Sequence, residues 1–457
     1  MAERVLSSVS KSAKPTILEE KKVNGVAEKV YNLVTRESEN ISPKPEILFG
    51  GSFAKGTWLK GEADIDIYMK FPIALSTEDL EKISLKIGLS ALESHQPYLR
   101  YSEHPYVEAI VDTIRVNVVA CFDVKSGEWR SSADRSPYHT NLIKSKFNQS
   151  LRQEVRILKM FLKSIDIYGA EVRTKGFSGY VSEVLIMKFG SFIDLLKAAI
   201  RFKEKEVITL SDEDLPHGQL HQSPLIILDP VDSRRNLGAA ISRRNVAKFI
   251  LASHLFLKKP SKKFFRVANI SYQSNLIKNL VMVRFTHSKR SVDILWGQLN
   301  RTLSRLERQL NYQGFRVIRS ARASNEDGES AFLFLLKNQD LGEFVVKNGP
   351  DVIMVNDSHQ FIRKNHSASM MTWIGDDGRL YSISECRVSD AISILHELLS
   401  SKISESGIAP GLIDDIRRTS KVLKGSKILS EGKTKPWLED AIGEIFGTDT
   451  IISRTNQ

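Results

Sequence analysis

Apolar and polar residues follow strand-like and helix-like patterns over the first 148 residues of the chain. Residues 17–37 carry apolar side chains at the spacing of an amphipathic helix. Short segments that alternate or run apolar predict strands. The pattern therefore predicts a small α/β head over residues 1–148, with strands at residues 47–49, 63–70, 107–112 and 113–122.

The pattern turns mostly helical after the head. Apolar residues recur at helical spacing from residue 150 onward, and one apolar strand is expected at residues 225–228. We interpret residues 149–260 as a mostly helical neck. The Lys-rich run Lys258–Lys263, which contains a proline, is interpreted as a linker.

A different order of elements follows this run. Residues 280–285 predict a strand, residues 292–312 a helix, and two further strands follow. This βαββ order is typical of a split-βαβ, RNA-recognition-like body, expected over residues 261–387. Residues 388–457 are interpreted as a mainly helical tail that could return to the body at its C-terminus. The predicted fold class is α+β, and the two further strands are expected at residues 315–320 and 331–336.

Two carboxylates stand inside one of the predicted head strands. Asp64 and Asp66 are two residues apart, so their side chains leave the same face of the strand, whereas Ile65 and Ile67 face the core. Adjacent carboxylates repel each other unless a cation lies between them, and oxygen ligands suit Mg²⁺. An edge strand that merely exposes two aspartates is the alternative interpretation.

A glycine turn precedes these acids. Gly51 and Ser52 can bring backbone N–H groups and a hydroxyl close to phosphate oxygens. A Gly-Ser pair followed about a dozen residues later by Asp-x-Asp is similar to the signature of the nucleotidyltransferase superfamily, which includes DNA polymerase β, poly(A) polymerases and tRNA nucleotidyltransferases. Further segments resemble archaeal (class I) CCA-adding enzymes, densely to about residue 245, and they are residues 50–61, 101–107, 134–139, 154–163, 167–171, 175–180, 189–192 and 229–236.

This resemblance implies a fold and a reaction. In this superfamily an RNA 3′-hydroxyl attacks the α-phosphorus of a nucleotide and pyrophosphate leaves, with two Mg²⁺ ions stabilising the attacking and leaving oxygens. Asp64 and Asp66 would hold both ions. A third carboxylate is expected on the adjacent strand, where it would bind one ion and help to remove the proton of the 3′-hydroxyl.

The sequence departs from the family at that third position. The alignment places Asn117 there, and an amide keeps one oxygen acceptor but loses the charge and cannot act as a base. Neither Asp112 nor Asp123 offers an obvious replacement. Three explanations stay open: an engineered inactive variant, a natural enzyme with a weaker metal site, or a binding protein that has lost catalysis.

Other roles are implied by the resemblance, residue by residue. Ser52 and Lys55 match positions that cradle phosphates, and Arg235, with Asn236 beside it, matches the arginine that reads the edge of the incoming base. An arginine offers donors to cytosine or adenine and meets donors on guanine. Three further residues match positions that contact the triphosphate or the ribose: His139, Lys159 and Tyr168. For each of them a structural role stays open, as a turn cap, a solvated side chain or a core residue.

Some residues are candidates for contact with RNA. The resemblance puts Glu103 and His104 near the RNA 3′ end. In the predicted helix over residues 292–312, leucines form one stripe and arginines lie on another face. The arginine face is either an ordinary solvated surface or a phosphate-backbone contact. The arginines are Arg301, Arg305 and Arg308.

Composition supports this interpretation. The 457 residues include 66 Lys and Arg against 54 Asp and Glu, a net charge of +12 that favours polyanionic partners. Only Cys121 and Cys386 could pair, too few for a disulfide framework or a zinc finger, which suggests a reducing compartment. No apolar segment resembles a signal peptide or a membrane span. We expect a soluble, cytoplasmic protein without a membrane partner.

Together these features predict a tRNA nucleotidyltransferase. It would build or repair the 3′-terminal CCA from CTP and ATP with Mg²⁺, and its body and tail would hold the acceptor arm and TΨC region of tRNA. A homodimer is left open. Two alternatives are a poly(A) or oligoadenylate-type RNA nucleotidyltransferase and, because of Asn117, a catalytically silent tRNA-binding protein.

Overall fold

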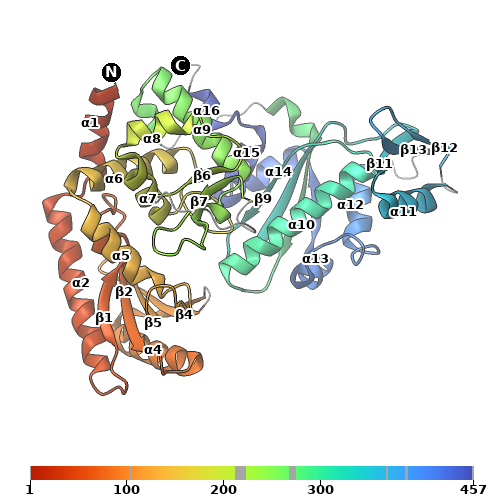
Figure 1. Ribbon diagram of the computed structural model, residues 1–457. Coiled ribbons are helices and arrows are strands. Elements are labelled where there is room, and N and C mark those ends of the chain that lie inside the picture. Colours follow the sequence, from red (N-terminus) through yellow and green to blue (C-terminus); the bar gives the residue numbers. More distant parts are fainter. Residues whose placement is uncertain are drawn as a thin grey trace. The chain divides into compact units, whose positions relative to one another are not determined.

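The computed structural model divides the chain into two compact units (Figure 1). One unit comprises residues 1–268 together with residues 451–457, and the other comprises residues 269–450. The structure describes residues 2–101, 104–210, 223–266, 274–366, 369–385 and 390–454. Within these ranges, no helix is both long enough and apolar enough to cross a membrane.

The head of the first unit is a five-stranded mixed sheet with the order β1-β2-β5-β4-β3. The central strands β2 and β5 run parallel, and the other neighbours pair antiparallel. The four head strands predicted from the sequence are therefore present, and β3 is an additional strand. Its strands are β1 (Glu46–Gly50), β2 (Asp64–Pro72), β3 (Tyr98–Tyr101), β4 (Pro105–Val111) and β5 (Ile114–Asp123).

Two helices cover one face of this sheet. Helix α2 (Ile17–Ser38) begins at a capping box in which Thr16 and Glu19 bond each other's backbone N–H groups, and α4 (Thr77–Ala91) begins at the N-cap Ser76. Both helices contribute to the apolar core under the sheet, together with Ile65 and Ile67 of β2. In Figure 1, α2 lies along one side of the head. The face of β2 that carries the acids is consequently directed away from this core.

Helices dominate the rest of the first unit. They are α1 (Ala2–Ala13), α5 (Arg135–Lys146), α6 (Gln149–Ser164), α7 (Gly179–Phe189), α8 (Phe192–Ala199) and α9 (Arg243–Lys258). Side-chain caps on Asn148, Ser178, Ser191 and Ser242 start α6 to α9. The short parallel strands β6 (Glu206–Ile208) and β7 (Leu225–Ile227) complete this part.

An aromatic cluster forms the centre of this helical core. Phe161 contacts five other phenylalanine rings at centroid distances of 5.3–6.4 Å. Val9 of α1 and Ile451 of α16 (Thr450–Ser453) are buried in the same core. The Lys-rich segment expected as a linker runs from the end of α9 into a 3₁₀ turn, Lys262–Phe265, and two phenylalanines of this turn are buried in the cluster. The five rings belong to Phe192, Phe249, Phe256, Phe264 and Phe265.

The second unit contains the predicted split-βαβ arrangement. Strand β10 (Glu329–Leu336) pairs antiparallel with β8 (Leu280–Thr286) and with β9 (Val317–Ser324), so β8 and β9 run parallel on either side of it. Helix α10 (Val292–Tyr312) connects β8 to β9 and buries its leucine stripe, as predicted. A fourth strand, β14 (Lys421–Lys424), pairs with β8.

Two features of the second unit were not predicted, a second small sheet and the strand β14. A three-stranded sheet follows β10, consisting of β11 (Phe344–Asp351), β13 (Arg379–Glu385) and β12 (Met371–Ile374), with α11 (Val355–Asn365) packed beside it. Strand β14 lies inside the segment interpreted as helical. Two helices of that segment cover one face of the β8–β10 sheet. The helices of the segment within this unit are α12 (Ala391–Leu399), α13 (Ile413–Thr419), α14 (Ser426–Gly432) and α15 (Pro436–Phe446), and α14 and α15 are the covering pair.

Replacement of Phe161 by alanine tests the role of the aromatic cluster. The cavity left by a fully buried phenylalanine typically costs about 3–5 kcal/mol of folding free energy. We therefore expect Phe161→Ala to lower the thermal unfolding midpoint of the first unit clearly, measured by calorimetry. Phe344→Ala, at a side chain that is 49% exposed in the second unit, is the control. Equal losses for both variants would contradict this assignment of the core.

Candidate functional site

The two acids of β2 lie on one face of the strand, as the sequence predicts. Ile65 and Ile67 between and beside them are fully buried on the opposite face. Burial raises the pKa of the Asp64 carboxyl; the Arg115 guanidinium opposes this rise, and the charge of Asp66 adds to it. Burial also raises the pKa of Asp66. The two carboxylates are thus close enough to repel each other, which is the arrangement that a bound cation would stabilise.

A glycine turn passes directly against these acids. Helix α3 (Gly51–Lys55) follows β1 without a loop, and Gly51 has a φ of +60°, in the left-handed region. A Cβ atom at Gly51 would lie 1.7 Å from Oδ2 of Asp66, so no other residue fits there without movement. The turn predicted to approach phosphates therefore lies beside the acid pair.

Asn117 lies next to Asp66. Strands β2 and β5 pair in parallel, and their register sets Asp66 opposite Asn117. The Asn117 amide donates from Nδ2 to Oδ1 of Asp66 at 2.8 Å. Its Oδ1 is buried and has no hydrogen-bond partner in the described part of the chain. Two carboxylates and an amide oxygen are hard oxygen donors of the kind that suits a divalent cation, but the Asn117 amide presents its nitrogen, not its oxygen, to Asp66.

The other two aspartates considered for this position lie elsewhere. Asp112 is in the turn between β4 and β5, with a φ of +49°. Asp123 ends β5 and pairs with Lys70 at 3.2 Å. Across the described residues, no group of three or more His, Cys, Asp or Glu side chains is arranged to hold a metal ion. The acid pair therefore has no third carboxylate in an equivalent position.

A cavity of about 580 Å³ opens at Asp64, whereas Asp66 and Asn117 do not line it. Four of the residues predicted from the sequence line it: Ser52, Asp64, Lys159 and Tyr168. Arg115 of β5 also lines it, although the sequence analysis did not single out that residue. The cavity brings together side chains from the head sheet and from α6, which are about 100 residues apart in the chain.

Lys55 and Lys159 belong to a buried polar network. Glu183 of α7 is 1% exposed and accepts hydrogen bonds from Lys55 Nζ at 2.9 Å and from Thr57 Oγ1 at 2.6 Å. Lys159 Nζ donates to the carbonyl oxygen of Thr57 at 2.9 Å. Burial lowers the pKa of Lys159 to about 8. In the sequence, Glu183 appeared only as an interruption of an apolar helix.

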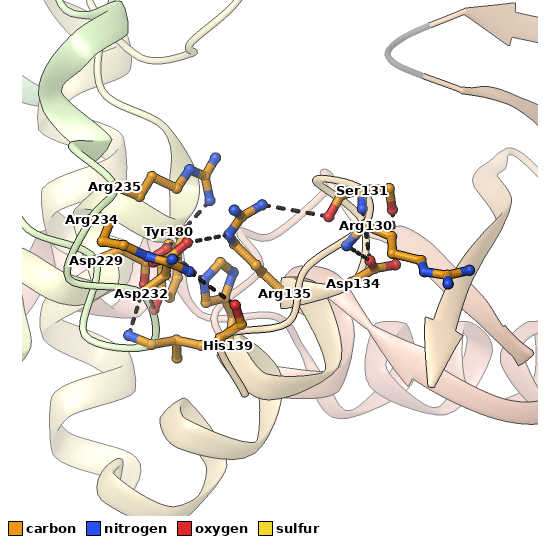
Figure 2. Close-up of polar contacts among 12 residues, drawn as sticks. Arg130, Ser131, Asp134, Arg135, His139, Tyr180, Asp229, Asp232, Arg234 and Arg235 are labelled. Carbon is orange, nitrogen blue, oxygen red and sulfur yellow. Dashed lines mark hydrogen bonds and ion pairs between the residues drawn. The ribbon is translucent and has the colours of Figure 1, made fainter. Parts of the chain in front are cut away.

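A second buried hub forms around Asp229, whose side chain is completely buried (Figure 2). Its Oδ2 lies 2.9 Å from His139 Nε2 and 3.3 Å from Arg235 Nη1, and its Oδ1 accepts a hydrogen bond from Tyr180 at 3.2 Å. The His139 and Tyr180 rings stack at 3.8 Å. Two residues predicted to contact the nucleotide, His139 and Arg235, are thus joined through one carboxylate that the sequence analysis did not recognise as a site residue.

Within this hub, the pKa shifts favour the neutral form of His139 and the charged form of Asp229. Burial lowers the pKa of His139, although the hydrogen bond to Asp229 opposes that shift. Burial favours the neutral form of Asp229, but the His139 hydrogen bond and charge outweigh it, so the pKa of Asp229 is lowered. Three residues after Asp229, Asp232 pairs with Arg135 at 2.9 Å. These pairs connect α5 with the loop after β7.

Asn236 has a local structural function in this state. Its Oδ1 accepts hydrogen bonds from the backbone N–H groups of Ile227, at 2.9 Å, and Gly238, at 2.8 Å. Its Nδ2 is buried without a hydrogen-bond partner in the described ranges. The amide therefore fixes the turn after β7, directly beside Arg235, and its predicted contact with the nucleotide stays a prediction.

The residues predicted to contact RNA lie in both units. Arg301, Arg305 and Arg308 are exposed on α10, away from its buried leucine stripe. His104 precedes β4, and its Nδ1 lies 2.6 Å from Oε1 of Glu81. Glu103 lies outside the described residues.

The buried ion pair between Lys55 and Glu183 can be tested by removing one partner and by replacing both. Glu183→Ala leaves the Lys55 ammonium buried without its carboxylate, which typically costs about 3–5 kcal/mol. We expect a clear drop in the denaturation midpoint of the first unit, and we expect Lys55→Met combined with Glu183→Leu to recover most of it. A double variant no more stable than Glu183→Ala would contradict this account of the pair.

Comparisons with known proteins agree along the chain. Family models match in sequence order: a nucleotidyltransferase domain over residues 32–139, a tRNA nucleotidyltransferase second domain over residues 153–266, and a CCA-adding enzyme C-terminal domain over residues 278–425. Among solved structures, one of the Cid1 RNA terminal uridylyl transferase aligns with a TM-score of 0.47 and 15% identity, covering 58% of this chain and 98% of that one.

Curated relatives give a closer match. The CCA-adding enzyme of Sulfurisphaera tokodaii is 38% identical over 340 residues, which cover 74% of this chain and 79% of the relative. The CCA-adding enzyme of Saccharolobus shibatae is 34% identical over 397 residues, 86% of this chain and 92% of the relative. Because this similarity spans most of both chains and the three family models follow one another in order, the chain belongs to the CCA-adding enzyme family of tRNA nucleotidyltransferases.

Proposed function

We propose that this chain adds or repairs the 3′-terminal CCA of tRNA, using CTP and ATP without a nucleic-acid template and releasing pyrophosphate. One observation carries the proposal beyond family membership. Asp64 and Asp66 share one strand face beside the Gly51 turn, and Asp64 lines a cavity that Ser52 and Lys159 also line. A metal-binding carboxylate and a lysine in one cavity, with a glycine turn beside the acid pair, are features that suit a nucleoside triphosphate.

Membership of this family implies use of a divalent metal ion. We infer that the ion is Mg²⁺ and that Asp64 and Asp66 would hold it, with Oδ1 of Asn117 as a neutral oxygen donor. When bound, Mg²⁺ supplies positive charge that stabilises the reacting phosphate oxygens. The side chains of the cavity would hold the triphosphate and the RNA end in line with each other.

The remaining site residues would contact either the triphosphate or the base of the nucleotide. Lys159, which lines the cavity, would supply positive charge for the triphosphate. Lys55 is matched to the same role by the family resemblance, although its Nζ pairs with Glu183 at 2.9 Å and it does not line the cavity. The Arg235 side chain is 41% exposed although its guanidinium is fixed by Asp229 at 3.3 Å. A fixed guanidinium with free donors suits recognition of cytosine and adenine edges. His139 and Tyr168 would complete the contacts to the triphosphate or ribose.

Exposed arginines of the second unit fit the RNA part of the substrate. Arg301, Arg305 and Arg308 present three cations on the exposed side of α10. Duplex RNA is recognised mainly through its phosphates and 2′-hydroxyls, so such a surface suits the acceptor arm and TΨC region of tRNA. The protein would act in the cytoplasm, where its tRNA substrate lies.

The exchange of Asn117 for aspartate tests the proposed chemistry. A carboxylate beside Asp66 restores a charged metal ligand and a group able to accept the proton of the 3′-hydroxyl, which is typically worth on the order of 100-fold in rate. We expect Asn117→Asp to raise nucleotide addition by about that factor. The assay uses tRNA lacking its last three nucleotides, each labelled NTP in turn, and Mg²⁺.

Two controls make the result decisive. Asp112→Asn, in the turn between β4 and β5, should leave the rate unchanged. A product ladder longer than three nucleotides would instead indicate a poly(A) or oligoadenylate-type activity. Tight tRNA binding without incorporation by either form would indicate a silent tRNA-binding protein, and equal rates for both forms would refute the assignment of position 117.

The pH dependence of nucleotide binding tests Lys159. Burial holds the pKa of Lys159 at about 8, so its ammonium becomes neutral as the pH rises through that value. We expect the affinity for ATP to be constant below about pH 7 and to fall as the pH rises through 8 toward 9.5, measured by calorimetry. Lys159→Arg, which stays charged, should remove the fall. A profile that is identical in both proteins would exclude Lys159 as the titrating phosphate contact.

A further inference from the structure

Arg115 brings a positive charge onto the face of the sheet that carries the acids. It precedes Asn117 by two residues on β5, so both side chains leave the same face of the strand. The register of the parallel pair sets Arg115 opposite Asp64, as it sets Asn117 opposite Asp66. Each acid of β2 therefore has a hydrogen-bond donor, not another acid, as its neighbour on β5.

The contacts of Arg115 leave its guanidinium able to bind another group. Its Nη1 lies 3.8 Å from Oδ2 of Asp64, and its Nε lies 3.9 Å from Oε1 of Glu108. Both separations are longer than hydrogen bonds. The side chain is 52% exposed and lines the cavity together with Ser52 and Lys159. An arginine offers five donors, so phosphate oxygens in this cavity would find unused ones.

The balance of charge around the acid pair differs from that of an all-carboxylate metal site. Asp66 accepts a hydrogen bond from the Asn117 amide at 2.8 Å, which occupies one of its oxygens. Asp64 is partly neutralised by Arg115, which lowers the pKa that burial raises. The protein itself thus supplies part of the positive charge that a metal ion would bring to these carboxylates.

We propose that the Arg115 guanidinium has two roles in this site. It competes with divalent ions for Asp64, and it binds the triphosphate of the nucleotide. The identity of the phosphate ligand rests on the proposed function. The competition for Asp64 rests on the geometry alone. A guanidinium suits this position because its planar fork can turn from a carboxylate to a phosphate while it stays charged.

The alternative is that Arg115 serves only to neutralise the buried carboxylate of Glu108. Glu108 lies on β4 opposite Asn117, is 4% exposed, and bonds the hydroxyl of Tyr98. Arg100 pairs with it at 3.5 Å. If Arg115 served only to neutralise Glu108, Arg100 and Arg115 would be equivalent. Arg100 is therefore the matched control, because it faces the same buried carboxylate but forms no ion pair with Asp64 among the described residues and does not line the cavity.

The first experiment measures Mn²⁺ binding by electron paramagnetic resonance on the full chain without nucleotide or RNA. We expect Arg115→Gln to bind Mn²⁺ about threefold to fivefold more tightly, the range for a charge pair at a half-exposed site. Arg100→Gln should bind Mn²⁺ like the parent protein. No change in Arg115→Gln, or an equal change in Arg100→Gln, would overturn the competition for Asp64.

The second experiment measures ATP binding in the presence of EDTA. Arg115→Gln should bind ATP about threefold to fivefold more weakly, whereas Arg100→Gln should be unaffected. Unchanged ATP affinity, or a loss confined to a short RNA probe, would overturn the assignment of the triphosphate as the ligand. Because neither measurement requires nucleotide transfer, a failure of CCA addition would leave both results interpretable.

Discussion

The repulsion between Asp64 and Asp66 is the constraint on which the rest of the site depends. The pleat of β2 forces both carboxylates onto one face, and the buried isoleucines on the other face prevent the strand from rotating to separate them. The surrounding residues therefore either relieve this repulsion or exploit it. Asn117 and Arg115 relieve it within the protein, and a divalent ion would relieve it from outside.

Two buried carboxylates organise the remaining side chains. Glu183 holds Lys55 and Thr57, and Asp229 holds His139, Arg235 and Tyr180. Each carboxylate has its charge compensated by the groups it orients, which is the condition under which a buried charge can be tolerated. Three residues predicted to contact the nucleotide, Lys55, His139 and Arg235, are thus held in place by two buried acids.

The sequence was informative where the signal was local. The alternation of β2 and the helix from Val292 to Tyr312 could be predicted from short-range patterns. The position of Asn117 beside Asp66, 51 residues away in the chain, was expected from the family resemblance instead. Glu183 and Asp229 could not, because each gains its meaning from partners about 90 to 130 residues away. The small sheet of β11, β12 and β13 was missed because its strands are short and partly exposed, so their apolar periodicity is weak.

The amide at position 117 also affects the stability that the protein would have without a bound metal ion. An aspartate there would set a third negative charge beside two others on adjacent strands, and without metal the fold would bear that strain alone. Asn117 replaces the strain with a hydrogen bond to Asp66 at 2.8 Å. The head sheet of this chain therefore carries one negative charge fewer at this point than an aspartate would give it, so its stability depends less on a bound metal ion.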